Sequence, residues 1–192
     1  MAVNEPASPA GYKFAFDSGV DNVYYFTTTN TIVREVKFKP SPYALGDDFA
    51  LGEHIYELVL KVVDSPTDKN PPFDTLTAPT VAAIINDFYT RSSLTITIYI
   101  CDTSDRRETL RWYKFNRWYD HFHANNYFRA DQAVLDEKDG VLYHCAFIIK
   151  ANNPQQDGRD HRLQPVDGRL QHGKIDLPAH IATQINKGCS YE

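Results

Sequence analysis

The side chains best suited to bind an anion are concentrated between residues 106 and 118. Five of the 20 basic residues lie there and alternate with both tryptophans: Arg106, Arg107, Arg111, Lys114 and Arg117, with Trp112 and Trp118. Spacings of three and four residues place Arg107, Arg111 and Lys114 on one helical stripe. Guanidinium forks on such a stripe, with free amides at the helix start, bind phosphate well. The sequence therefore predicts an anion-binding region that begins at Asp102 and Ser104 and ends at Arg117.

Two other interpretations of this basic stripe are open. The tryptophans between the cations could stack on the bases of an RNA strand. Acidic neighbours could instead pair with the arginines on a solvated face, and this structural interpretation is the favoured one: Asp102, Asp105, Glu108 and Asp120. The net charge of -5 argues against nucleic-acid binding through the overall field of the protein.

Cysteine and histidine chemistry has weaker support. Cys101 ends an apolar segment just before the basic helix, where the helix dipole and Arg106 or Arg107 would stabilise a thiolate. A buried, unreactive thiol is nevertheless favoured, because cysteine is a common small core residue. His121 and His123 point about 200° apart on a helix and so cannot share one ion. No metal site is predicted.

The sequence also disfavours several classes of protein. Three cysteines without a C-x-x-C pair, Cys101, Cys145 and Cys189, predict a reducing compartment and hence a cytoplasmic protein. No segment has the length and apolarity of a membrane helix, and residues 1–11 lack the apolar core of a secretory signal. The motifs of P-loop, Rossmann, serine-hydrolase and zinc-protease sites are missing from the sequence. A soluble protein with no membrane partner is expected.

Alternating apolar residues predict the strands that must position the basic helix. Four such segments follow one another without a helix, which indicates an antiparallel meander: 12–16, 23–27, 32–38 and 54–63. The segment Leu94 to Cys101 is the strongest strand and is expected at the centre of the sheet. Segments 129–135 and 141–150 flank a turn sequence and predict a closing hairpin.

Two helices are predicted between these strands. The first has Thr77 as its N-cap, ends near Arg91 and buries an apolar stripe: Val81, Ile84, Ile85 and Phe88. The second starts near Asp105, runs to about Ala124 and buries a mainly aromatic stripe: Trp112, Phe115, Tyr119 and Phe122. The element order is β-β-β-β-α-β-α-β-β. We therefore expect an α/β protein of the α+β type, with a mixed, mainly antiparallel sheet of about seven strands and two main helices.

The remaining segments set the domain limits. Residues 1–11 are expected to be a flexible N-terminus, 12–151 a single domain, and 152–192 a polar C-terminal arm that is partly disordered. The crossover from Asp64 to Pro79 contains four prolines and no glycine. Its segment Pro71 to Asp74 is expected to fix Phe73 in the core.

This element order resembles that of GNAT-type N-acetyltransferases from their second strand onward, over roughly residues 12–150. The resemblance implies acetyl-CoA as a cofactor, with Tyr113, or failing that Tyr119, protonating the departing thiolate. In that family a glycine-rich loop before the first of these helices grips the pyrophosphate of the cofactor. Here that loop is the glycine-free crossover Asp64 to Pro79, which departs from the family pattern.

Three sequence motifs resemble a group of small bacterial proteins of unknown function. They are C-D-T-S-D-x-R at Cys101 to Arg107, F-N-R-W at Phe115 to Trp118, and P-P-F-D at Pro71 to Asp74. This resemblance implies no activity.

These observations lead to one main expectation and two alternatives. The main one is a GNAT-like protein without the pyrophosphate loop and without catalysis, which binds a protein partner or a small anionic ligand through the region from Asp102 to Arg117. The first alternative is an active acyltransferase with a modified cofactor loop. The second is a nucleic-acid-associated factor that uses the helix rich in arginine and tryptophan.

Overall fold

The computed structural model describes residues 11–42, 44, 52–67, 72–101, 106–122, 126–136, 141–151, 153, 165–166 and 169–170. Asp102 and Ser104 of the predicted anion-binding region lie outside these residues. So do residues 1–10, Cys189 and most of the predicted C-terminal arm.

Seven strands form one mixed sheet in the order β1-β2-β3-β4-β5-β7-β6. The first four make the predicted antiparallel meander: β1 (Phe14–Asp17), β2 (Val23–Thr27), β3 (Val33–Pro40) and β4 (Ile55–Asp64). A short 3-10 helix, Gly52–His54, precedes β4. The predicted central strand is β5 (Ile96–Ile100), and the closing hairpin is β6 (Tyr127–Asp136) with β7 (Val141–Lys150). The α+β class and the element order are as predicted.

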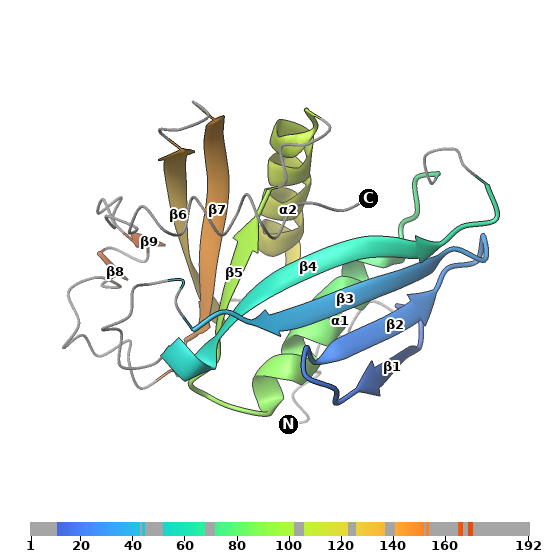
Figure 1. Cartoon of the computed structure of the whole chain (residues 1–192), viewed down its shortest axis with the longest axis horizontal. Coiled ribbons are helices and arrows are strands. Elements are labelled where there is room, and N and C mark those ends of the chain that lie inside the picture. The colour runs from blue at the N-terminus through green and yellow to red at the C-terminus, as the bar shows by residue number, and fades with distance from the viewer. Residues whose placement is uncertain are drawn as a thin grey trace, which may run out of the picture.

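Strands β4 and β5 form the one parallel pair of this seven-stranded sheet, and they pair over a short distance. Their register runs from Ile55 opposite Ile96 to Leu58 opposite Tyr99, although β4 continues to Asp64. Beyond Leu58, β4 pairs with β3 alone, while β5 stays paired with β7. Figure 1 shows the result: β4 turns away from β5, and the two strands form a V that opens toward their carboxyl ends.

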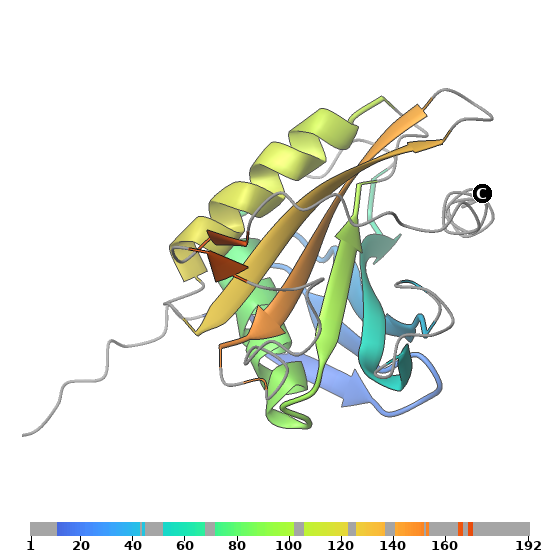
Figure 2. The ribbon, with the colours of Figure 1, turned by 90° about the vertical axis from the view of Figure 1, so that its left-hand side faces the viewer.

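Two helices pack on one face of the sheet. They are α1 (Thr77–Thr90) and α2 (Glu108–Phe122), both behind the sheet in Figure 1 and seen from the side in Figure 2. The prediction that Thr77 is the N-cap is wrong, because Leu76 occupies that position and Thr77 is already helical. The reason is Asp74, whose carboxylate accepts a hydrogen bond from the Leu76 amide at 2.8 Å and turns the chain before the helix begins. Helix α2 begins at Glu108, three residues later than predicted.

The main core lies between the sheet and the two helices. It consists largely of aromatic and branched side chains, among them Tyr24, Phe38, Phe88, Tyr89 and Phe115. The rings of Phe38 and Phe88 stack with centroids 3.8 Å apart and join β3 to α1, and those of Tyr99 and Phe115 stack at 4.0 Å and join β5 to α2. The predicted helix stripes are therefore the faces that pack on the sheet.

One predicted core residue lies on the surface instead. Phe73 is 83% exposed, so the expectation that the proline-containing crossover fixes its ring in the core is wrong. Asp74 instead holds the end of the crossover, because its carboxylate accepts hydrogen bonds from the Tyr12 hydroxyl and the Leu76 amide, and the Phe73 ring is left in solvent just before α1.

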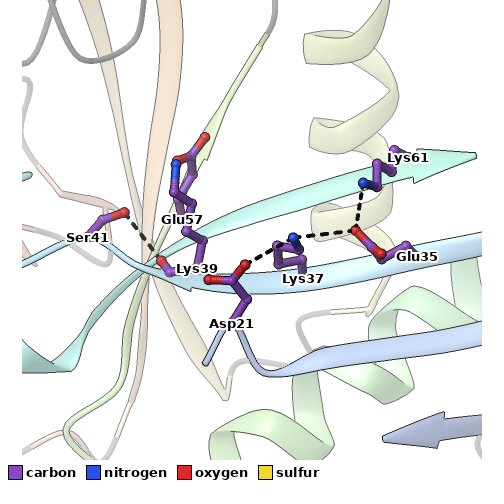
Figure 3. A network of polar contacts seen from close by, with 7 residues as sticks. All are labelled: Asp21, Glu35, Lys37, Lys39, Ser41, Glu57 and Lys61. Atoms are coloured by element: carbon purple, nitrogen blue, oxygen red, sulfur yellow. Dashed lines mark hydrogen bonds and ion pairs between the residues drawn. The ribbon is translucent and has the colours of Figure 1, made fainter. Parts of the chain in front are cut away.

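The second face of the sheet is divided between apolar and charged residues. Over β5 and β7 it is apolar and buried, with Ile96, Ile98 and Phe147 at its centre. Over β3 and β4 it carries a polar network, shown in Figure 3, in which the Lys61 ammonium lies 3.1 Å and the Lys37 ammonium 3.8 Å from the Glu35 carboxylate. Both cations of this network are therefore paired with carboxylates.

Candidate functional site

Two cations from distant elements converge at the open end of the V. Arg34 belongs to β3 and has the same parity as Val36 and Phe38, so its side chain points to the helix-bearing face of the sheet. Lys114 projects from the middle of α2. Each interacts electrostatically with Asp74, just before α1. The three charges therefore share one region beside the start of α1.

Electrostatics show that the two cations are imperfectly compensated. Partial burial lowers the pKa of Arg34, and Asp74 offsets this effect in part. Desolvation also lowers the pKa of Lys114, and repulsion from the Arg34 guanidinium lowers it further. Each cation makes the charged form of the other less favourable. A bound anion would therefore stabilise both charges.

The Asp74 carboxylate is already engaged by groups of the protein. One oxygen accepts a hydrogen bond from the Tyr12 hydroxyl at 3.0 Å, and the other accepts one from the Leu76 amide at 2.8 Å. Tyr12 is itself tied to α1, because its amide donates to Thr80 Oγ1 at 2.8 Å. Asp74 is thus held in place between Tyr12 and α1, and it neutralises one of the two cations at most.

Two buried polar atoms at this end of the fold have no hydrogen-bond partner among the residues that the structure describes. They are Nε of Arg34 and Oγ1 of Thr77, the first residue of α1. Thr77 is only 3% exposed. Buried donors and hydroxyls are normally satisfied, so these two atoms indicate a polar ligand or ordered water beside them.

An apolar groove runs from this region between the two helices. One wall is a stripe of α1 with two alanines, Ala78, Val81, Ala82 and Ile85. The other wall is the aromatic stripe of α2, Phe115, Trp118, Tyr119 and Phe122. Ile148 of β7 and Tyr127 of β6 complete the lining. The Lys114 ammonium lies 4.8 Å from the centroid of the Trp118 ring, so the groove begins beside the cation pair.

The other predicted anion-binding residues of α2 lie in different environments. Arg106, Arg107 and Arg117 are exposed, as Lys114 itself is. Arg111 instead acts electrostatically on Tyr99 and Cys101, which lie below α2. Lys114 is the member of the predicted basic stripe that the structure brings together with Arg34 and Asp74.

The two candidate tyrosines lie in different environments. Tyr113 is 66% exposed on α2. Tyr119 is half-buried, and its hydroxyl donates a hydrogen bond to the Tyr127 carbonyl oxygen at 2.8 Å. Burial raises the pKa of Tyr119 to about 12. The Tyr119 proton is therefore directed at the backbone of β6.

Cys101 is buried at the end of β5, against the underside of α2. Burial raises the pKa of its thiol to about 11, although the nearby charges of Arg111 and Arg129 favour the thiolate. Cys145 on β7 is also buried, and burial raises its pKa to about 12. Both thiols are therefore protonated at neutral pH, as the core interpretation expects.

A labelling experiment tests this assignment of the cysteines. In a Cys189→Ser variant, Cys101 and Cys145 are expected to react with iodoacetamide only slowly below pH 9, because thiolates form at higher pH and both groups are buried. Unfolding in guanidinium is expected to restore ordinary reactivity at both sites, measured by mass spectrometry of tryptic peptides. Rapid labelling of Cys101 in the native protein at pH 7 would instead identify an accessible, activated nucleophile.

The cation pair contains a residue that sequence analysis did not select. Arg34 occupies an even-numbered position in β3, where Val36 and Phe38 are core residues, so a charge interrupts the apolar face of the strand. That interruption is visible in the sequence and could have identified it. Lys114 was predicted, but its convergence with Arg34 depends on how α2 packs over the sheet. Among the described residues, no three His, Cys, Asp or Glu side chains are grouped closely enough to bind a metal ion.

The chain matches the model of a known family over part of its length. The model of a family of unknown function, DUF6169, matches residues 74–162, which begin at Asp74 and include α1, β5, α2, β6 and β7. The chain thus resembles an uncharacterised family over a little less than half of its length. No curated protein and no solved structure matches the chain. In the described part of the chain, no helix is both long and apolar enough to span a membrane.

Proposed function

We propose that the protein is a GNAT-like binding protein without catalytic activity, which holds a small anionic ligand at Arg34 and Lys114. The observation that carries this proposal is the convergence of these two cations, from β3 and α2, beside the first residue of α1. Their mutual repulsion and the unsatisfied Arg34 Nε both favour an anion between them.

The shape of the sheet supports the GNAT-like part of the proposal. A cofactor slot in that fold requires the strand before α1 to splay from β5, and β4 leaves β5 after Leu58. The binding mode differs, however, because the crossover has no glycine and supplies few free amides. Pro79 has no N–H, and the Leu76 N–H is already donated to Asp74. Side-chain cations would therefore replace the backbone amides of the family's pyrophosphate loop.

The surroundings of the two tyrosines support binding without acyl transfer. Tyr119 donates its proton to a carbonyl oxygen, and the Tyr113 side chain is mostly in solvent, where water competes for any proton transfer. A general acid must reach the atom that it protonates. The buried thiols of Cys101 and Cys145 further support a reducing location such as the cytoplasm.

Calorimetric titration at low salt with inorganic phosphate tests the anion site. We expect weak, millimolar binding to the native protein and at least a tenfold loss of affinity in Arg34→Met and in Lys114→Met. Lys13→Met, which removes the same charge from an exposed position, is the matched control and should change affinity less than twofold. Arg34→Met should unfold at the same or a higher temperature without ligand, because it removes a partly buried, unsatisfied cation. Undetectable phosphate binding, or equal loss in all three variants, would contradict the proposal.

The splay of β4 from β5 also favours a second candidate, an active acyltransferase. This candidate predicts micromolar acetyl-CoA binding and an acyl transfer that slows in Tyr113→Phe. A binding protein without catalysis predicts that thiol release from acetyl-CoA stays at the buffer rate with amine acceptors present. Measurement of that release with the native protein and with Tyr113→Phe separates the two candidates.

A further inference from the structure

We infer that the ligand of this site carries a short aliphatic tail, and that the groove between α1 and α2 binds the tail of a short-chain carboxylate whose head group lies at Arg34 and Lys114. This inference rests on the proposed function and narrows its ligand to one class. The observation behind it is the apolar groove, because binding of an anion alone would not need such a groove.

The groove is small and apolar: its cavity volume is about 50 Å³, which limits an apolar chain in it to a few carbon atoms. Ala78 and Ala82 leave one wall shallow, whereas Phe115, Trp118 and Phe122 form a tall aromatic wall opposite. Ile148 lies in the lining between the two helices. Small residues on one helix and large rings on the other leave a trough, where an alanine-to-leucine change would fill the space.

The two tyrosine hydroxyls of the groove lining are already hydrogen-bonded to protein partners. The Tyr119 hydroxyl donates to the Tyr127 carbonyl oxygen at 2.8 Å, and the Tyr127 hydroxyl donates to Asn86 Oδ1 at 3.0 Å. A ligand in the groove would therefore find apolar surface, and any polar group buried there would lose its hydrogen bonds to water. The part of the ligand that occupies the groove must accordingly be hydrocarbon.

The binding site for the anionic head group and the groove for the tail meet at the start of α1. Ala78 of the groove follows Thr77, whose buried hydroxyl has no partner among the described residues. On the opposite wall, Lys114 lies over the ring of Trp118, which lines the groove. A molecule with its charge at Lys114 and Arg34 would thus direct its remaining atoms along the apolar trough.

Charge complementarity selects a monoanion. Arg34 and Lys114 carry two positive charges, and Asp74 returns one negative charge, so the site has a net charge near +1 at neutral pH. A carboxylate matches this charge and can accept a fork of hydrogen bonds from the Arg34 guanidinium. A nucleotide or pyrophosphate would bring more negative charge than the site compensates and would leave the groove empty.

Titration of the native protein with straight-chain carboxylates, from acetate to octanoate below their micelle concentrations, tests the inference. Each added methylene is expected to improve affinity about two- to fourfold, as burial of one CH₂ predicts, until the groove is filled. Ala82→Leu, which fills the trough, should abolish the dependence on chain length while phosphate affinity stays unchanged. Ala83→Leu, next to it but outside the groove lining, is the matched control and should keep the dependence.

The outcomes separate the inference from the proposed function. If phosphate binds and affinity is the same for all chain lengths, the tail site is wrong and the anion site stands. If neither phosphate nor any carboxylate binds, both are wrong. If the longer carboxylates bind equally well in Lys114→Met and Arg34→Met, the groove binds hydrocarbon without a head group, which overturns the proposed function. The chain-length series on the native protein decides the inference even if Ala82→Leu fails to fold.

Discussion

Replacement of Tyr89 by phenylalanine is expected to lower the free energy of unfolding by about 2–4 kcal/mol, because it removes a hydroxyl that bridges two strands of the sheet. Tyr89 projects from α1 and is 1% exposed. Its hydroxyl donates to the Ile148 carbonyl oxygen of β7 at 2.6 Å and accepts from the Thr97 amide of β5 at 3.2 Å. It also contacts Thr97 Oγ1. Phenylalanine keeps the ring and its packing but leaves these three buried groups without their partner.

Tyr113→Phe is the matched control for this prediction. It removes the same hydroxyl from a side chain that is 66% exposed, so its effect on stability should stay below about 0.5 kcal/mol. Urea denaturation of both variants, with equal slopes, gives the comparison. A Tyr89→Phe protein as stable as the native one would mean that the direct pairing of β5 with β7 is sufficient and that the Tyr89 bridge is dispensable.

Tyr89 also shows where sequence analysis reaches its limit. The stripe Val81, Ile84, Ile85 and Phe88 predicted α1 correctly, because the helix buries an apolar face against the sheet. The role of Tyr89 depended on which strands lie beneath the helix. That arrangement follows from β7 lying between β5 and β6, a non-local pairing. The sequence contains a partial indication of it, since the segment Cys145 to Ile149 is continuously apolar, as expected for an interior strand, whereas β6 contains the charged residues Arg129, Asp131 and Asp136.

The candidate site, like α1, could be predicted in part from the sequence. The composition of α2 indicated an anion site on the correct helix, and Lys114 was among the residues selected. The other half of the site, Arg34, lies 80 positions earlier in a strand that looked like ordinary alternation. Helical spacing groups residues of one element, and it gives no information about which strand faces them. The hydrogen bonds of Asp74 explain why two other predictions were wrong. They place the N-cap of α1 at Leu76 and not at Thr77, and they leave Phe73 outside the core.

Replacement of Arg129 by methionine is expected to cost about 2–3 kcal/mol of stability and to weaken anion binding, because Arg129 fastens α2 to the edge of the sheet. Its side chain is 9% exposed, and its guanidinium carbon lies 4.9 Å from the centroid of the Trp112 ring and 5.3 Å from that of Tyr119. Nε donates to Asp131 at 2.5 Å, and Nη2 donates to Asn116 of α2. Methionine keeps an aliphatic stem but loses the cation–π contacts and both hydrogen bonds.

The effect on binding follows from the position of Arg129 below α2. Asn116 and Lys114 lie on the same helical turn, so a looser α2 places the Lys114 ammonium less accurately over Trp118 and beside Arg34. Phosphate affinity should therefore fall in Arg129→Met although Arg129 touches no ligand, whereas Arg129→Lys, which retains the charge, should recover part of the stability. Denaturation and phosphate titration of the two variants check this order, with Lys13→Met as the charge-matched control. If Arg129→Met lost stability but bound phosphate as tightly as the native protein, the position of Lys114 would be set by the aromatic stripe of α2 alone.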